Sequence, residues 1–363
     1  MFRWLLLPFA FIYGLIVWIR NRMFDTNVLP SKEFNLPIIS VGNITVGGTG
    51  KTPHVEYLLK LLHQDKKVAV LSRGYKRKSS GFLVAGLDTS SVKIGDEPRQ
   101  IKRKFPEVAV AVDGNRVHGI NKLLSGAAGF DPDVVVLDDA FQHRYVKPGL
   151  SILLVDYNRP LEKDYMLPYG RLRESVSEKK RANIIIVTKT PPNLKPIERR
   201  IISTDMKLFP YQNLFFTYLK YGALKPVFFE NAELLTKKID DKKLDVLLVT
   251  GIANPVPLKE YIESKYNRVE HLKFPDHHSF TVKDLNKIDK VFNAMASDNT
   301  IIITTEKDAV RMSDNKIFEP LASILYYVPI EIEFLDDDHE VFNKRVASFI
   351  SNSKKIQGLN RSI

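Results

Sequence analysis

The chain has 363 residues, 44% of them hydrophobic, which is enough for about two domains that each bury a core. It contains no cysteine, so disulfide frameworks, thiolate zinc sites and cysteine nucleophiles are excluded. Lysine and arginine number 54 against 42 acidic residues. The resulting net charge of +12 favours an anionic partner, such as a phosphorylated substrate, a nucleic acid or an acidic membrane surface.

The N-terminus is an apolar segment with basic flanks. Residues 4–19 carry no charge and are flanked by Arg3, Arg20 and Arg22. A straight membrane span needs about 20 apolar residues, and a proline and a glycine interrupt this shorter run. We therefore predict that residues 1–28 form a monotopic helix that lies in the membrane interface. A buried core helix and a cleaved signal peptide are the alternatives.

The sequence PIISVGN, followed by TVGGTGKTP, predicts a strand that leads into a phosphate-binding loop at a helix N-terminus. Glycines let backbone N–H groups turn inward, and the lysine places positive charge beside phosphate oxygens. The strict pattern G-x-x-x-x-G-K-[ST] would have glycine at position 45, where this chain has threonine. The residues expected to bind the nucleotide are Thr45, Val46, Gly47, Gly48, Thr49, Gly50, Lys51 and Thr52.

Short runs rich in β-branched residues alternate with helical stretches after this loop. They lie at residues 66–74, 108–114, 133–140, 151–156 and 183–189. Their continuous hydrophobicity is typical of parallel strands that helices cover on both faces. We therefore predict a P-loop NTPase-like α/β domain with a mostly parallel sheet over residues 29–210.

The second half of the chain repeats the α/β pattern on a smaller scale. Residues 211–230 predict a two-stranded linker between domains, with a turn at Gly222. A smaller α/β domain is expected over residues 231–350, followed by a flexible tail at 351–363. Its predicted strands cover residues 244–251, 268–274, 299–305 and 324–334.

An acidic pair follows one of the predicted buried strands. Asp138 and Asp139 come directly after four apolar residues, at the strand end where ligands bind in open α/β sheets. Carboxylates there can hold Mg²⁺ together with the hydroxyl of Thr52, because this cation prefers oxygen ligands. Capping of a helix N-terminus is the alternative role for these two aspartates.

Other polar segments are weaker signals when each is taken alone. Asp96 in IGDEPRQ is by default a helix cap, and His277 in FPDHHSF is by default a surface or structural residue. Arg171 and Arg173 in LPYGRLRES form either a phosphate clamp or a solvated pair. Neither IIIVTKTP nor ITTEKDAV contains the guanine motif N-K-x-D, so adenine is expected rather than guanine.

Taken together and in this order, the apolar N-terminus and the motifs TVGGTGKTP, SRGYKRK, GDEP, DDAFQHR, LPYGRLRES, FPDHHSF and TEKDAVRM resemble the tetraacyldisaccharide 4'-kinase family of bacterial lipid A biosynthesis. The resemblance covers nearly the whole chain. It implies transfer of the γ-phosphoryl group of ATP, with Mg²⁺, to the 4'-hydroxyl of a tetraacyldisaccharide 1-phosphate, which gives lipid IVA. It also implies attachment to the cytoplasmic face of the inner membrane, with no nucleic acid and no obligate protein partner.

The resemblance also assigns roles to individual residues. Lys51 would contact the β- and γ-phosphates, and Thr52 and the acidic pair would hold Mg²⁺. Asp96 matches the family's general base and His277 the side chain that orients or activates it. Either Arg171 or Arg173 would face the transferring phosphate or the lipid headgroup. Gln142 and His143 are further candidates for headgroup contacts.

Other functions remain open at this point. A P-loop GTPase or metal chaperone would be expected to carry the guanine motif and metal ligands. An ATP-driven nucleic-acid binder would show a steep salt dependence. A membrane-associated nucleotide-binding protein without catalysis is disfavoured by the intact Lys51, Thr52 and Asp138.

Overall fold

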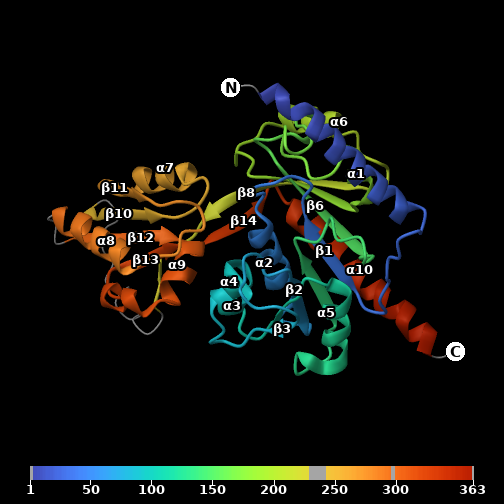
Figure 1. Cartoon of the computed structure of the whole chain (residues 1–363), viewed down its shortest axis with the longest axis horizontal. Coiled ribbons are helices and arrows are strands. Elements are labelled where there is room, and N and C mark those ends of the chain that lie inside the picture. The colour runs from blue at the N-terminus through green and yellow to red at the C-terminus, as the bar shows by residue number, and fades with distance from the viewer. Residues whose placement is uncertain (1–2, 229–242, 296–298, 362–363) are drawn as a thin grey trace.

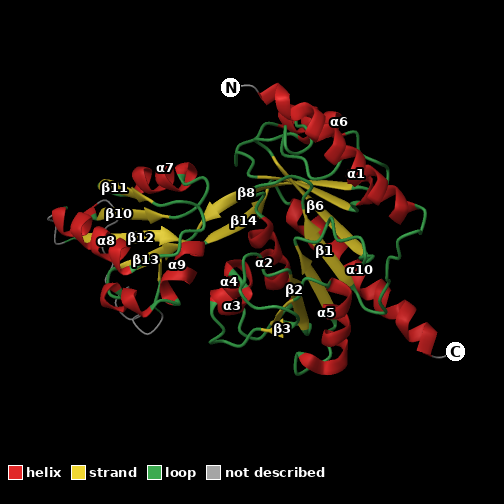
Figure 2. Cartoon of the chain, in the orientation of Figure 1, coloured by secondary structure: helices red, strands yellow, loops and turns green. Residues whose placement is uncertain are grey.

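Two domains of unequal size make up the protein (Figure 1). The computed structural model describes residues 3–228, 243–295 and 299–361, and within these ranges the side chains of residues 4–353. Two antiparallel strands connect the domains (Figure 2): β8 (Asn213–Tyr221) runs toward the smaller domain and β14 (Ile330–Phe334) runs back to the larger one.

The sheet of the larger domain is parallel from β8 to β4, with an antiparallel strand at each edge. Helices α2, α4 and α10 cover one face, and α5 and α6 cover the other, which explains the continuous apolar runs. The predicted parallel α/β architecture is therefore confirmed. In spatial order, the strands are β14 (Ile330–Phe334), β8 (Asn213–Tyr221), β7 (Ile184–Thr188), β6 (Leu150–Asp156), β1 (Ile38–Gly42), β5 (Val134–Asp138), β2 (Val68–Ser72), β4 (Ala109–Val112) and β3 (Leu83–Val84).

The smaller domain has its own sheet and core. Its strands are parallel except for β9, which pairs antiparallel with β13. In spatial order, they are β11 (Arg268–Lys273), β10 (Asp245–Thr250), β12 (Thr300–Thr305), β13 (Leu325–Val328) and β9 (Lys225–Pro226). The predicted second α/β domain is therefore present.

Helices connect most of these strands. The α-helices are α1 (Leu7–Asp25), α2 (Lys51–Leu62), α3 (Ser91–Ile94), α4 (Asp96–Lys104), α5 (Arg116–Lys122), α6 (Pro196–Met206), α7 (Val256–Lys265), α8 (Val282–Ala294), α9 (Glu306–Ser313) and α10 (Asp338–Arg361). Short 3₁₀ turns lie at Arg3–Leu6, Leu161–Lys163, Val176–Arg181 and Lys316–Leu321, and a π turn lies at Leu123–Ala127.

The run predicted as one strand over residues 324–334 forms two strands in two different sheets. Strand β13 belongs to the smaller domain and β14 to the larger one, and Pro329 separates them. Proline lacks the N–H that a continuous ladder needs, so the chain changes sheets there. The C-terminal domain therefore ends before residue 330, and the predicted boundary at 350 is wrong.

The predicted linker over residues 211–230 also pairs differently from the prediction. Strand β8 pairs with β14 and not with the run that follows Gly222, while β9 joins the sheet of the smaller domain. Residues 229 and 230 lie outside the described residues. The connection is two-stranded, but its second strand comes from about 110 residues further along the chain.

Helix α10 returns the chain to the larger domain. Phe342, Val346 and Ile350 are at most 3% exposed and pack in the same core as β1 and α2. The helix continues to Arg361, so most of the predicted flexible tail is helical. Residues 362 and 363 lie outside the described residues.

The apolar N-terminal segment is a helix on the surface of the larger domain, along the upper right in Figure 1. Among the described residues, Trp4–Asp25 is the one helical stretch long and apolar enough to cross a membrane, and 11% of its most apolar window is buried. The side chains of Phe11 and Trp18 are 73% and 60% exposed, whereas that of Phe24, near the C-terminal end of the helix, is 3% exposed. The alternative of a buried core helix is therefore wrong for most of this segment.

Candidate active site

The phosphate loop, residues 45–52, connects the central strand β1 to helix α2. Because β1 lies between β5 and β6, the loop emerges in the middle of the carboxyl edge of the sheet. Gly47 and Gly50 have φ of 109° and 83°, a left-handed conformation that glycine adopts at little cost. Helix α2 begins at Lys51 and has Thr52 buried in its first turn, so the positive end of its dipole faces the loop. This is the geometry of an anion-binding nest.

The end of strand β7 supports this loop from the side. Thr188 Oγ1 donates a hydrogen bond of 3.0 Å to the carbonyl of Thr49, and Lys189 Nζ donates to the carbonyl of Gly48. Lys189 also lies 2.8 Å from Asp156 Oδ2 and has φ of 58°, which is unusual for a lysine. From the sequence alone, the segment IIIVTKTP is informative only because it lacks the guanine motif N-K-x-D. No local pattern predicts that its lysine reaches the phosphate loop.

The two candidate arginines occupy different positions. Arg173 Nε donates to the carbonyl of Thr45 at 3.1 Å, and its Nη2 donates to Asn43 Oδ1 and lies 3.5 Å from Asp139 Oδ1. Arg171 has an exposed side chain and contributes its backbone carbonyl, which accepts from Val46 N at 2.8 Å. The structure therefore places the guanidinium of Arg173, and not that of Arg171, beside the phosphate loop.

The acidic pair ends strand β5 next to this loop. Asp138 is fully buried and accepts a hydrogen bond of 3.3 Å from Ser72, while its Oδ1 has no partner among the described residues. Burial, together with the nearby carboxylates of Glu97 and Asp139, raises the pKa of Asp138 to about 7. Asp139 lies 3.6 Å from Lys51 Nζ and has φ of 48°.

These residues fit a magnesium ion. A buried carboxylate oxygen without a hydrogen-bond partner is costly, and a divalent cation would relieve that cost. Mg²⁺ is bound by one or two carboxylates together with phosphate oxygens and water, rather than by a complete protein cage. The described part of the chain contains no cluster of three or more His, Cys, Asp or Glu side chains that could hold a metal ion.

Asp96 and His277 come from different domains and meet at their boundary. Asp96 is the first residue of helix α4, and His277 follows β11 with φ of 59°. Asp96 Oδ2 lies 3.4 Å from His277 Nδ1. Arg311 of helix α9 donates to the same oxygen through Nη2 at 2.6 Å and Nε at 2.9 Å, and its Nη2 is 3.1 Å from His277 Nδ1. Arg311 therefore holds both predicted residues together.

A second ion pair lies beside this junction. Glu97 accepts from Lys307 of helix α9 at 2.6 Å. Burial alone would raise the pKa of Glu97, but Lys307, and to a smaller extent Lys51 and His277, lower it below its ordinary value. The charge of Lys51 thus acts on the first turn of helix α4. Gln100 of α4 also donates to Glu56 of α2 at 2.8 Å, so α4 packs against the helix that begins at the phosphate loop.

The sequence does not predict a role for Lys307 or Arg311. Both lie in the motif TEKDAVRM, which contributes to the family resemblance but carries no assignment. Their spacing of four residues puts them on one side of a helix, which is the signal that could have paired them with the adjacent acids of GDEP. The partner segment lies about 210 residues earlier in the chain, and no sequence pattern identifies it.

Gln142 and His143 lie in the loop that follows the acidic pair. The backbone carbonyl of Gln142 accepts from Arg20 Nη2 at 3.3 Å. Burial and then the charges of Arg116, Arg20 and Arg73 lower the pKa of His143 to about 4. His143 is therefore neutral at physiological pH.

Comparison with known proteins gives one consistent result. The family model described as tetraacyldisaccharide-1-P 4'-kinase matches residues 2–351. Proteins named tetraacyldisaccharide 4'-kinase from Phocaeicola vulgatus and Flavobacterium johnsoniae are 49% and 45% identical to the chain. The first match covers 97% of this chain and 96% of the relative, and the second 97% and 98%.

A solved structure agrees with this result. LpxK from Aquifex aeolicus, crystallised in complex with ATP, is 28% identical and superposes with a TM-score of 0.75. The match covers 96% of this chain and 99% of that one. Because the family model and the relatives match almost from end to end, this chain belongs to the tetraacyldisaccharide 1-phosphate 4'-kinase family.

Proposed function

We propose that the protein transfers the γ-phosphoryl group of ATP to the 4'-hydroxyl of a tetraacyldisaccharide 1-phosphate and so forms lipid IVA in lipid A biosynthesis. The observation that carries this proposal is the meeting of two sets of residues at one domain boundary. The phosphate loop and Asp96 belong to the larger domain, while His277 and Arg311 come from the smaller one. A kinase needs this arrangement because its donor and acceptor must be brought into line.

Positive charge around the phosphates supports the transfer step. Lys51 and Arg173 both approach Asp139, at 3.6 and 3.5 Å, and both lie at the phosphate loop. In the proposed mechanism, Lys51 contacts the β- and γ-phosphates and Arg173 faces the transferring group. Their charges would stabilise the negative charge that spreads over the phosphoryl oxygens in the transition state.

The magnesium ligands are proposed from the same geometry. Thr52, Asp138 and Asp139 would hold the ion, with the unpartnered Oδ1 of Asp138 as the first candidate. A bound Mg²⁺ would neutralise phosphate oxygens and orient the γ-phosphate. The raised pKa of Asp138 means that binding the ion displaces a proton from this carboxyl below about pH 7.

Asp96 is proposed as the general base for the sugar hydroxyl. Arg311 occupies Asp96 Oδ2, and among the described residues nothing bonds to Oδ1, which can accept the proton. His277 Nδ1 lies nearer to Arg311 Nη2 than to Asp96, so this nitrogen acts as an acceptor here. His277 then orients Asp96 through Arg311 rather than by a direct bond. Help from such a base amounts to about 10²- to 10⁴-fold.

Helix α1 is proposed to bring the enzyme to its lipid acceptor at the cytoplasmic face of the inner membrane. Its exposed face is apolar, whereas its other face contacts loops of the site. Tyr13 donates to the carbonyl of Arg173 at 3.1 Å, and Asn21 donates to Glu174 at 3.2 Å. An acyl chain in the membrane beside α1 would therefore have its sugar headgroup near the phosphate loop. Arg20 of the same helix, whose Nη2 donates to the carbonyl of Gln142 at 3.3 Å, would suit the phosphate of that headgroup.

The direct test is a transfer assay with the purified full-length chain. Mg·ATP labelled at the γ-phosphate is mixed with the disaccharide 1-phosphate in detergent micelles, and a 4'-deoxy acceptor serves as the control. Label should appear on the 4'-oxygen of the first acceptor and be absent from the second. Nucleotide hydrolysis without labelled lipid, or equal use of GTP, would instead favour a P-loop NTPase of another kind.

A further inference from the structure

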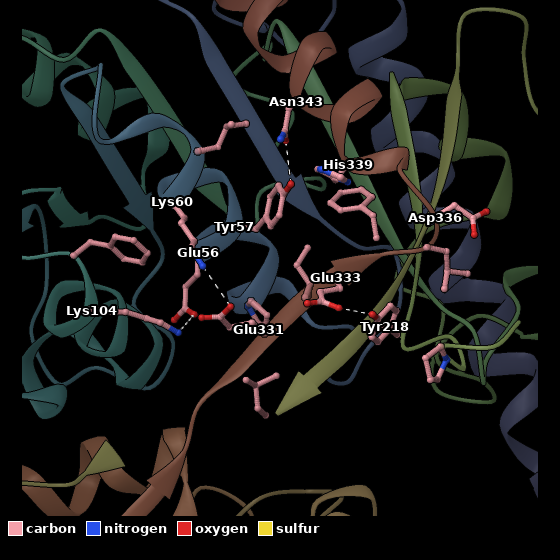
Figure 3. Close-up of a pocket in the computed structure, with 18 residues that line it drawn as sticks. Glu56, Tyr57, Lys60, Lys104, Tyr218, Glu331, Glu333, Asp336, His339 and Asn343 are labelled. Atoms are coloured by element: carbon pink, nitrogen blue, oxygen red, sulfur yellow. Dashed lines mark hydrogen bonds and ion pairs between the residues drawn. The ribbon is translucent and has the colours of Figure 1, made fainter. Parts of the chain in front are cut away.

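Helix α4 contacts the smaller domain at its far end as well as at its start. Its last residue, Lys104, donates from Nζ to Glu56 Oε2 of helix α2 at 2.6 Å and to Glu306 Oε1 of helix α9 at 3.1 Å. Lys104 and Glu56 line a cavity of about 670 Å³ together with residues of α2 and β14. Figure 3 shows their ion pair. One ammonium group therefore joins three helices from two domains.

This ion cluster is shielded from water. The side chains of Glu56 and Glu306 are 5% and 9% exposed, and that of Lys104 is 21% exposed. Gln100 donates to the second oxygen of Glu56 at 2.8 Å, and the N–H of Ile330 donates to the second oxygen of Glu306 at 3.2 Å. Without Lys104, two buried carboxylates would face each other with no cation between them.

Each member of the cluster is attached to part of the candidate active site. Glu56 lies on helix α2, which begins with the phosphate-loop lysine. Lys104 ends the helix that begins with Asp96. Glu306 is the first residue of helix α9, which also carries Arg311. Through its bond with Ile330, Glu306 additionally contacts the first residue of the strand that returns to the larger domain.

The contacts between α4 and α9 are mainly polar. They include Arg99 with Asp314 at 3.1 Å, in addition to the pairs already described. Polar contacts of this type are typical of domains that move relative to one another, because each contact can be exchanged for water. The Arg99–Asp314 pair is also largely buried, with side chains 13% and 10% exposed, but it joins α4 only to the end of α9. The Lys104 cluster includes helix α2 as well, so it can fix all three helices relative to one another.

We propose that Lys104 is a positioning residue for phosphoryl transfer. It holds helix α9 at a fixed position against helices α2 and α4, so that Arg311 meets Asp96 when the domains are together. The proposal deepens the function given above and rests on it for the role of Asp96. In the described part of the chain, the ammonium group of Lys104 bonds to Glu56 and Glu306 and to none of the phosphate-loop residues 45–52.

The same cavity provides a matched control. Lys60 also lies on helix α2 and pairs with Glu331, as Figure 3 shows. Lys60 Nζ is 3.4 Å from Glu331 Oε2. The side chains of this pair are 67% and 49% exposed, so water screens their interaction. Lys60→Met removes the same charge from the same cavity wall without leaving a buried carboxylate alone.

The experiment compares Lys104→Met, Lys104→Arg and Lys60→Met in the full-length chain. Since the chain has no cysteine, Lys122→Cys in α5 and Ser264→Cys in α7 give two unique and exposed labelling sites, one on each domain. The distance between spin labels on these cysteines is measured with and without ATP, and kcat and KM are measured in the unlabelled variants. Lys104→Met should broaden the distance distribution and lower kcat at least about tenfold, with KM for ATP changed less than about twofold. Lys104→Arg, which keeps the positive charge, should have the distance distribution and the kcat of the wild type. Lys60→Met should also resemble the wild type in both.

A wild-type distance distribution and wild-type kcat in Lys104→Met would overturn the proposal. If Lys104→Met does not fold, Glu306→Leu removes the acceptor from the same contact, and an unchanged distance distribution would again refute the proposal. The distance measurement needs no catalysis. A wild-type enzyme that fails to label the acceptor therefore contradicts the proposed function, and an unchanged distance in the variants contradicts the positioning role.

Discussion

The exposed face of helix α1 should supply most of the membrane affinity. Phe11 and Trp18 are 73% and 60% exposed. Complete burial of a large apolar side chain contributes about 1.5–3 kcal/mol, so the exposed portions should contribute about 1–2 kcal/mol each. The double variant Phe11→Ser/Trp18→Ser should therefore lose about 2–4 kcal/mol of binding, which corresponds to about 30- to 1000-fold weaker partitioning.

The assay is sedimentation with vesicles that contain anionic lipid, at low and at high salt. Salt should release little of the wild-type protein, because apolar burial dominates and Arg20 is already engaged with the carbonyl of Gln142 and the ring of Phe24. Val256→Ser/Val282→Ser, at residues 52% and 57% exposed on the smaller domain, is the matched control and should bind normally. Wild-type binding by the α1 variant, or complete release of the wild type by salt, would show that the reasoning about burial is wrong.

Four further predictions concern the site. Asp96→Ala should lower kcat about 10²- to 10⁴-fold with little change in the affinity for ATP, and near-normal turnover would exclude the proposed base. Arg173→Met should lower kcat about 10²-fold or more, whereas Arg171→Met, at an exposed side chain, should change it only a few-fold, and steady-state kinetics distinguish the two. Lys189→Met should raise KM for ATP more than it lowers kcat, because it removes support from the Gly48 carbonyl, and binding of a fluorescent ATP analogue measures the loss. His54 lies in the first turn of helix α2, with Nδ1 2.7 Å from the carbonyl of Gly50 in the phosphate loop. Burial lowers the pKa of His54 to about 4, so the unfolded chain binds more protons than the folded one between about pH 6.5 and 4. The free energy of unfolding should therefore fall by up to about 3 kcal/mol as the pH drops through that range, and urea titrations should show a smaller fall in His54→Gln.

The sequence predicts the core of the larger domain well. Continuous apolar runs determine parallel strands that are buried on both faces, and three glycines before Lys51 determine the phosphate loop within a few residues of chain. Both are local patterns. For the same reason, the apolar run that precedes Asp138 is sufficient to predict its position at a strand end next to this loop.

The pairing of distant segments was not predictable in the same way. The run over residues 324–334 contains a signal that could have divided it, because Ile330, Ile332 and Phe334 alternate with glutamates after the continuous apolar residues of β13. Alternation indicates a strand with one solvated face, as β14 has at the sheet edge. Which strand it pairs with depends on the path of the whole chain.

The contacts within the candidate site also join residues that are distant in the sequence. Asp96 and His277 are selected by resemblance, and the fold brings them to 3.4 Å. Arg311, which lies between them, makes shorter contacts with Asp96 than His277 does. No rule of local spacing connects residues 215 positions apart, so this interaction is evident only in the folded chain.

The antiparallel pairing of β8 with β14 makes the smaller domain an insert in the larger one. Tyr221 and Ile330 face each other as register partners, so the chain enters and leaves the insert at neighbouring points. A two-residue Asn-Gly turn could replace residues 222–329 and close β8 and β14 as an ordinary hairpin. During synthesis, the larger domain cannot complete its core until α10 leaves the ribosome, because Phe342 and Val346 fill it. The ribosome therefore completes the smaller domain, including Arg311, before the larger domain can finish folding.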